Sequence, residues 1–273
     1  MTALHKTPGG LRLRTLREQA GKTQLAVEVE ADLGSGYLQR IETGKVIHPQ
    51  RPTLERILAA LEARYGERRE VLELFGYMVT TPLPSEEEVD WACALSHSGL
   101  HSVVFPAYIL DCAHRLLAWN RYVPKLFGVA PQAMASWARA CMLDLWLNPR
   151  HGLTTLVDNP DTFFPAMVRA LRHEMQPFRH EEWCVELIAR LLRELPLFKK
   201  YWTVVEHAGM HAIAARAVVP MRLEVPGVGL LQFRLSAEHF TRDARFRIVY
   251  YLPADACTMQ QCAVWADLIA ADV

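Results

Sequence analysis

Apolar residues recur every three or four positions along the first quarter of the chain, which is the spacing of amphipathic helices. The clearest case has Leu54, Ile57 and Leu61 on one face. Pro52, just before them, suits the first turn of a helix, and Gly21 is a natural end for an earlier one. The helices that this pattern predicts are residues 11–20, 51–66 and 67–77.

The stretch between the first two of these helices has a different period. Val27, Val29 and Leu33 alternate with acidic residues, which is the pattern of a half-buried strand. Thr23, however, is a good N-cap, and short helical segments flank the stretch on both sides. We expect a helix over residues 23–32 and keep a strand in a hairpin as the alternative.

A linker separates these helices from the rest of the chain. Residues 78–84 hold two prolines and two threonines, which favour an irregular connection. Ser85 follows, and Glu88 stands three residues later, which is the spacing of a capping box at the start of a further helix. The sequence therefore predicts a helical first domain, a connecting segment and a second domain.

Runs rich in strand formers appear in the second domain. These runs are residues 107–111, 115–120, 216–225, 229–237 and 245–253. A short polar turn separates the first run from the second. The turn sequence "PGVG" lies between the third run and the fourth, so we expect those two to form a hairpin.

The segment between the two groups of strands has helical spacing. Residues 121–128 predict a short helix that ends at Gly128, and residues 131–207 hold few glycines. Pro196 interrupts the most amphipathic part of this segment. Residues 257–271 predict a closing helix, so the order of elements indicates an α+β fold.

Composition adds limits to this picture. The chain has 273 residues, of which 51% are hydrophobic, and a formal net charge of +0, so its overall charge does not indicate a nucleic-acid partner. Residues 1–64 are mildly basic, with ten Lys or Arg against seven Asp or Glu. The six cysteines form no C-x-x-C pair, which disfavours a zinc or redox site. No apolar run approaches the ~18 residues that span a membrane. We expect a soluble cytoplasmic protein that binds neither a membrane nor a metal.

Two motifs in the first domain resemble those of a known DNA-binding family. "GKTQ" (residues 21–24) and "YLQRIETGK" (residues 37–45) resemble the Xre-type, phage-repressor-like helix-turn-helix. In such a unit the second helix crosses the phosphate backbone, and the third lies in the major groove. The resemblance therefore implies that a double-stranded DNA operator is a partner.

The resemblance also implies which side chains contact DNA. Gln24 would lie near a phosphate, and Arg40 would reach bases, because an arginine can bind guanine O6 and N7 together. Lys45 and Arg51 fit phosphate contacts, whereas Glu42 fits a structural place. The expected DNA-binding residues are Gln24, Ser35, Tyr37, Gln39, Arg40, Lys45 and Arg51.

Three positions depart from the family pattern. Glu28 stands where a small Ala is usual, and a buried carboxylate without a partner is costly. Asp32 stands where Gly is usual, although Asp tolerates a left-handed turn. Gly36 offers no side chain at a reading position. The alternative is a domain of repressor ancestry whose DNA binding is weak or lost.

Five motifs in the second half resemble the MmyB-type ligand-binding domain, a PAS-like antiparallel sheet with a large helical insertion. Residues 105–128 resemble a PAS-type opening, with Asn120 and Gly128 at two of its positions. The other motifs are "LWLNPR", "LLRELPLFKKYW", "VPGVGLLQFR" and "FRIVYYLPAD". The family often has a His-Asp pair where this chain has Val205 and Glu206, so no role is carried over to that pair.

The two resemblances together imply a domain plan and an assembly. The expected domains are residues 1–77 for DNA binding, 78–104 as linker and connecting helix, and 105–273 for ligand binding. Because helix-turn-helix proteins of this family bind paired half-sites as dimers, we expect a homodimer on a pseudo-palindromic operator.

The second domain is rich in large apolar side chains. A sheet covered by helices and lined by such side chains would enclose an apolar cavity. We therefore expect a hydrophobic small-molecule ligand, a fatty acid or similar acyl chain, whose carboxylate an arginine such as Arg150 could hold. No other cofactor is required. The expected ligand-binding residues are Tyr108, Leu117, Trp119, Asn120, Trp146, Arg150, Trp183, Leu187, Phe198, Trp202, Phe233 and Tyr250.

Other function classes have weaker support. The two His-Glu pairs, at residues 173–174 and 180–181, do not complete H-E-x-x-H. The chain also shows no G-x-S-x-G, P-loop or dinucleotide-binding glycine pattern, so we expect no catalytic residues and no enzyme. A haem or flavin sensor and a protein-interaction module without a cavity remain the alternatives.

Overall fold

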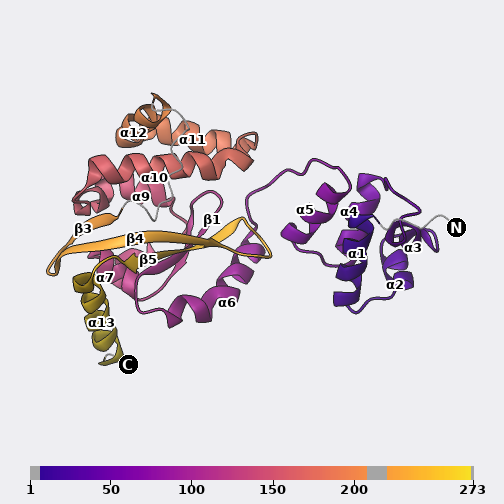
Figure 1. Cartoon of the computed structure of the whole chain (residues 1–273), viewed down its shortest axis with the longest axis horizontal. Helices are drawn as coiled ribbons and strands as arrows, with labels where there is room; N and C mark the ends of the chain where they lie inside the picture. The colour runs from indigo at the N-terminus through magenta and orange to yellow at the C-terminus, as the bar shows by residue number, and fades with distance from the viewer. Residues whose placement is uncertain (1–6, 208–219, 272–273) are drawn as a thin grey trace. The chain divides into compact units, whose positions relative to one another are not determined.

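The helical segments of the N-terminal part follow one another through short connections (Figure 1). The computed structural model describes residues 7–207 and 220–271. It divides into two compact units: the first holds the chain up to Thr80 together with Thr241–Ala244, and the second holds the rest. The helices of the first unit are α1 (Pro8–Gln19), α2 (Gln24–Glu30), α3 (Tyr37–Glu42), α4 (Arg51–Ala60) and α5 (Tyr65–Leu74).

The alternating stretch is helical. The Thr23 hydroxyl caps α2 by accepting a hydrogen bond from the Ala26 amide at 3.1 Å. Val27 is fully buried, whereas Val29 is 71% exposed, so the alternating apolar residues do not share a face as they would in a strand. A helix in this stretch is confirmed, although α2 covers only Gln24–Glu30 of the predicted residues 23–32, and the hairpin alternative is wrong.

The two helices after the turn region differ from the prediction at their ends. α4 begins at Arg51 as predicted but stops at Ala60, and Glu62 takes a left-handed backbone with φ +52°. α5 then begins at Tyr65, two residues before the predicted start. Apolar periodicity continues through this break because Leu61 still packs into the core, which is why the sequence predicted one longer helix.

An antiparallel sheet forms the centre of the second unit. Its strands are β1 (Ala107–Asp111), β2 (Leu116–Trp119), β3 (Met221–Val225), β4 (Gly229–His239) and β5 (Phe246–Pro253). They pair in the order β2-β1-β5-β4-β3. The predicted hairpin is present as β3 and β4, with Val225 opposite Gly229. Residues 216–219 of the predicted third run lie outside the described residues.

Helices supply the rest of the second unit. They are α6 (Glu86–Ser102), α7 (Tyr122–Phe127), α8 (Pro131–Ala135), α9 (Met142–Leu147), α10 (Pro160–Met175), α11 (Glu182–Glu194), α12 (Pro196–His207) and α13 (Ala256–Ala271), with short 3-10 turns at η1 (Pro149–His151), η2 (Leu153–Leu156) and η3 (Gln176–Phe178). The capping box at α6 is confirmed, because the Ser85 hydroxyl accepts from the Glu88 amide and the Glu88 carboxylate accepts from the Ser85 amide. Pro196 separates α11 from α12, also as predicted.

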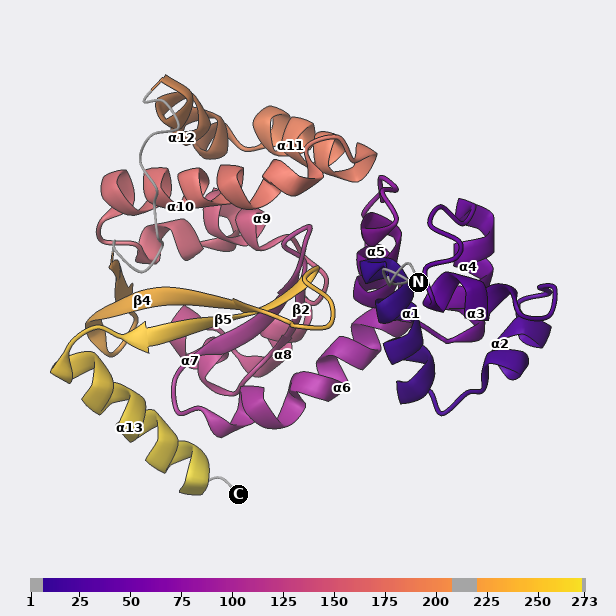
Figure 2. The same cartoon turned by 45° about the vertical axis from the view of Figure 1, so that its right-hand side comes forward.

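Helices lie on both sides of the sheet. Tyr108 and Leu110 of β1 point into a large core that includes Phe164 of α10, whereas Ala107 and Ile109 point to the opposite face and pack near Leu100 of α6. Figures 1 and 2 show α10, α11 and α12 on one side of the sheet and α6 on the other. The predicted α+β class, a helical N-terminal part followed by an antiparallel sheet with a helical insertion, is confirmed.

Candidate functional site

The exposed side of α3 carries most of the expected DNA contacts. Ser35 precedes the helix and is exposed, and Gln39 and Arg40 are exposed along it. Lys45 is exposed just after the helix ends. Tyr37 is half-buried against the core of the first unit, so part of its ring serves packing. The structure therefore gathers four of the seven expected residues on the accessible side of one short helix and its flanks.

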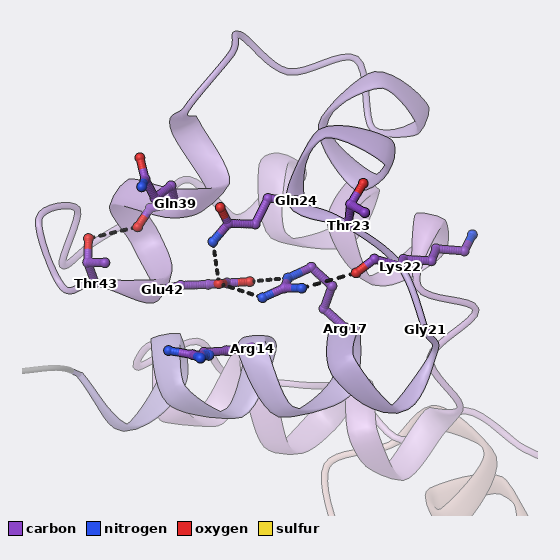
Figure 3. Close-up of a pocket in the computed structure, with 9 residues that line it drawn as sticks. All are labelled: Arg14, Arg17, Gly21, Lys22, Thr23, Gln24, Gln39, Glu42 and Thr43. Atoms are coloured by element: carbon purple, nitrogen blue, oxygen red, sulfur yellow. Dashed lines mark hydrogen bonds and ion pairs between the residues drawn. The ribbon is translucent and has the colours of Figure 1, made fainter.

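Glu42 forms the centre of a buried polar cluster behind that surface (Figure 3). Arg17 of α1 donates to it twice, with Nε 2.7 Å from Oε1 and Nη2 3.1 Å from Oε2. Gln24 of α2 also donates to it, with Nε2 2.7 Å from Oε2. The hydrogen bond to Glu42 raises the pKa of Arg17 above its ordinary value, although burial opposes it. One carboxylate thus fixes α1, α2 and α3 together, which agrees with the structural place expected for Glu42.

A pocket of about 520 Å³ opens beside this cluster. It is lined by Arg14, Arg17, Gly21, Lys22, Thr23, Gln24, Gln39, Glu42 and Thr43 (Figure 3). Three of these residues are cationic, and each pairs with an acid: Arg14 with Glu18, Arg17 with Glu42 and Lys22 with Glu30. Sequence reasoning placed Gln24 near a phosphate but missed Arg14, Arg17 and Lys22. Arg14 and Arg17 lie outside the two motifs, and the resemblance gives Lys22 no role.

The remaining two expected DNA contacts have partners within the protein. Gln24 donates to Glu42, as described. Arg51 pairs with Glu55 at 2.8 Å and donates to the carbonyl oxygen of Met78 at 3.1 Å. Both contacts of Arg51 lie at the surface, where an ion pair contributes little to stability.

Glu28 is buried but not without partners, which corrects the sequence expectation of a costly carboxylate. Its Oε2 accepts from the Gly36 amide at 3.0 Å, and its Oε1 accepts from the Leu38 amide at 2.8 Å. Asp32 takes φ +50°, the left-handed turn that was anticipated for it. The two departures from the family pattern are therefore compatible with the helix-turn-helix geometry.

The structure does not bring the expected ligand-binding residues into one site. Tyr108, Trp146, Phe198 and Phe233 are buried in the large core, and Trp119 packs at its margin. Leu117 and Tyr250 belong to the cluster on the opposite face of the sheet. The expectation that all these residues line one cavity is wrong, because successive side chains of a strand point to opposite faces of the sheet.

The two polar residues of that set differ in burial and lie on different elements. Asn120 is fully buried and its amide bonds the backbone throughout: Oδ1 accepts from the amides of Ala107 and Tyr122, and Nδ2 donates to the carbonyl oxygens of Leu100 and Phe105. These contacts fix the end of β2 and the start of α7. Arg150 lies on η1 and is exposed.

An apolar groove of about 370 Å³ lies among α10, η3, α11 and α12. It is lined by Arg172, Met175, Gln176, Arg179, Cys184, Val185, Ile188, Ala189, Leu192 and Trp202. The guanidinium of Arg172 stacks 4.8 Å from the centre of the Trp202 ring. None of these lining residues is acidic, so Arg172 and Arg179 give the groove a positive balance. Of the expected ligand residues, Trp202 lines this groove.

Trp183 and Leu187 line a different pocket, of about 340 Å³. Three arginines border it, and each is held by an acid: Arg115 by Asp111, Arg139 by Glu86, and Arg190 by Asp144. The indole of Trp183 donates to the carbonyl oxygen of Thr81 at 2.7 Å. The acids therefore neutralise the arginines of this pocket, whereas the lining of the groove beside Trp202 contains arginines and no acid.

The described residues contain no cluster of three or more side chains that could hold a metal ion. Within the same residues, the helices are too short or too polar to cross a bilayer.

Comparison with protein families gives two matches. Residues 10–72 match a family described as a helix-turn-helix domain. Residues 100–263 match a family described as the MmyB-like transcription regulator ligand binding domain. The search of curated proteins found no match. The two families occur in the order and at the positions that the sequence motifs indicated.

Proposed function

The chain belongs to the family of MmyB-like transcription regulators, and from this premise we propose that it is a cytoplasmic homodimer that binds a pseudo-palindromic operator and responds to a fatty acid or similar acyl compound. A helix-turn-helix joined to a ligand-binding domain is the architecture of a ligand-responsive regulator. We assign DNA binding to residues 1–77, ligand binding to 105–273, and the connection to 78–104.

The observation that carries the DNA-binding half is the division of α3 into two faces. Leu38, Ile41 and Glu42 are buried, whereas Gln39 and Arg40 are exposed. An arginine and a glutamine on the outer face of a recognition helix are the residue types that read guanine and adenine edges. Lys45 would then meet phosphates, together with Arg14 and Lys22 at the pocket, which would exchange Glu18 and Glu30 for phosphate oxygens.

The groove beside Trp202 supports an acyl ligand. Its volume of about 370 Å³ falls within the range of ~300–1,000 Å³ of small-molecule sites. Met175, Ile188 and Leu192 offer apolar contact to a hydrocarbon chain. Arg172 and Arg179 offer guanidinium groups to a carboxylate, which is their favoured anion. An uncharged or cationic ligand would leave this positive balance unused.

The proposed regulation is a shift between two arrangements of the dimer. Ligand that favours one arrangement would change the spacing of the two recognition helices and so the affinity for the operator. The effect on operator affinity cannot exceed the difference in ligand-binding free energy between the two arrangements.

The test combines ligand identification with DNA selection. Mass spectrometry of an organic extract of the purified protein, read beside its visible spectrum, should show a stoichiometric acyl compound and no haem or flavin absorbance. The full chain should also select an inverted repeat from a random duplex library. A coloured protein would overturn the acyl ligand, and failure to select any sequence would overturn the operator. Equal operator affinity with and without saturating palmitate would overturn the regulation.

A further inference from the structure

The start of α3 lacks a side-chain cap of its own. The residues before the helix are Gly34, Ser35 and Gly36, and Gly36, at the N-cap position with φ +77°, makes no side-chain hydrogen bond. The first amides of a helix need acceptors from outside it. A helix of only six residues is also marginal by itself, since so short a helix barely offsets its nucleation cost. The recognition helix therefore depends on an acceptor elsewhere in the fold.

Glu28 of α2 supplies that acceptor. Its carboxylate takes the Gly36 amide at 3.0 Å and the Leu38 amide at 2.8 Å, one with each oxygen. Leu38 is the second residue of α3, so its amide is one that an N-cap side chain ordinarily accepts from. The side chain is nearly excluded from solvent, with 3% of the residue exposed. A charged acceptor in such a site makes stronger hydrogen bonds than a neutral one.

We propose that Glu28 is the positioning residue of the recognition helix, and that it sets the direction in which Gln39 and Arg40 face the DNA. The two bonds tie the start of α3 to a rigid point on α2. Because α3 is short, a change at its first turn swings its whole exposed face. This inference rests on the proposed DNA-binding function, and it adds a specificity determinant that does not itself touch a base.

The geometry distinguishes this role from that of Glu42. Glu42 holds the C-terminal end of α3 through Arg17 and Gln24, whereas Glu28 holds the N-terminal end. The end held by Glu28 is the one that a helix-turn-helix presents to base edges. Loss of Glu28 should therefore change which bases are preferred, without removing the cationic side chains that contact phosphates.

The test compares Glu28→Gln with Asp32→Asn in the full chain. Both changes remove one negative charge in a nearly isosteric way, but Asp32 is almost fully exposed and its nearest cation, Arg56, is 3.9 Å away. Each protein is measured on the sequence that the parent selects from a random duplex library and on a scrambled duplex, over a series of salt concentrations.

Glu28→Gln should lower the ratio of the affinity for the selected duplex to that for the scrambled duplex by about tenfold, the equivalent of one hydrogen bond to a charged group. A new selection with this variant should return altered base preferences. The salt dependence should keep the parent slope, because the phosphate contacts are unchanged. Asp32→Asn should keep the parent ratio. A folded Glu28→Gln protein with the parent ratio and the parent base preferences would overturn the inference.

A second measurement tests the capping if Glu28→Gln fails to fold. Amide hydrogen exchange of the parent, read at Leu38, should show protection that falls in Glu28→Asp, whose shorter side chain cannot reach both amides. Unchanged protection at Leu38 would overturn the capping itself. A parent protein that selects no sequence would overturn the proposed operator function instead, while the exchange result still decides whether Glu28 caps α3.

Discussion

Arg17 of α1 and Glu42 of α3 form a two-pronged ion pair, with contacts of 2.7 and 3.1 Å, although 25 residues separate them in the chain. The Glu42 side chain is 2% exposed and the Arg17 side chain 12% exposed. Gln24 satisfies a further acceptor site of the same carboxylate. The pair therefore holds the end of the recognition helix from behind, where solvent and salt screen it little.

Removal of Arg17 should destabilise the first unit strongly. Arg17→Met leaves Glu42 buried beside Gln24 only, and breaking a buried pair from one side costs roughly 3–5 kcal/mol of unfolding free energy. Urea denaturation of the full chain, followed by circular dichroism, measures the loss. Arg14→Met is the control, since Arg14 makes an exposed pair with Glu18 and should change the transition little. Equal midpoints for the two variants would contradict this prediction.

Arg40 and Lys45 should have separable effects on DNA binding. Arg40→Ala should cost about 1–3 kcal/mol on the selected sequence and relax preference at one position, because a base contact is lost. Lys45→Ala should weaken binding to every duplex alike and reduce the salt slope by about one, because a phosphate contact is lost. Fluorescence anisotropy on selected and scrambled duplexes gives both quantities. If Arg40→Ala discriminated the two duplexes as well as the parent does, Arg40 would have no reading role.

A charge placed in the groove beside Trp202 should prevent acyl binding. Ile188→Asp puts a carboxylate against the hydrocarbon chain. It should lower the affinity for palmitate by about tenfold or more, because the bound chain would remove water from the charge without replacing its hydrogen bonds. Val204→Asp is the control, since Val204 is 49% exposed on α12 and does not line the groove. Native mass spectrometry or displacement of a fluorescent acyl probe measures both. Equal affinities would place the ligand elsewhere.

The cysteines should differ in reactivity and make stability depend on alkaline pH. Burial raises the pKa of Cys112 to about 12, and the pKa values of Cys141 and Cys262 to about 11. At pH 8 iodoacetamide should therefore modify exposed Cys257 first and these three only after unfolding.

The sign of the pH effect follows from the raised pKa values. The folded protein keeps the three thiols protonated, so their contribution to stability is complete below about pH 9, the ordinary thiol pKa. It is lost progressively as pH rises from there toward about 12. Urea midpoints measured between pH 8 and pH 10.5 should fall, and midpoints that rise over this interval would contradict the assignment.

Much of the fold could be predicted because its signals are local. Helix caps at Thr23 and Ser85, the break at Pro196 and the hairpin turn before Gly229 depend on residues within a few positions of each other. The end of α4 could not be predicted in this way. Its apolar periodicity runs on through Leu61, while the backbone turns at Glu62.

The candidate sites were predictable to different degrees. Four of the expected DNA-binding residues, Ser35, Gln39, Arg40 and Lys45, follow a contiguous motif on a short helix and its flanks, so their spacing in sequence brings them together. The expected ligand residues came from aromatic content spread over many elements, and the structure distributes Trp183 and Trp202 between two separate pockets. Aromatic content states that a core exists but not which side chains border an opening in it.

The sequence by itself determined the order of elements, the two-part architecture and the outward residues of the recognition helix, because each depends on periodicity, caps or a contiguous motif. Only the tertiary structure decided what Glu28 does. By itself it reads as a costly carboxylate in place of a small residue, and its partners at Gly36 and Leu38 exist only once α2 and α3 have packed. A buried carboxylate destabilises the fold when it lacks hydrogen-bond donors and holds elements together when amides donate to it. No pattern along the chain specifies which amides lie close enough to donate.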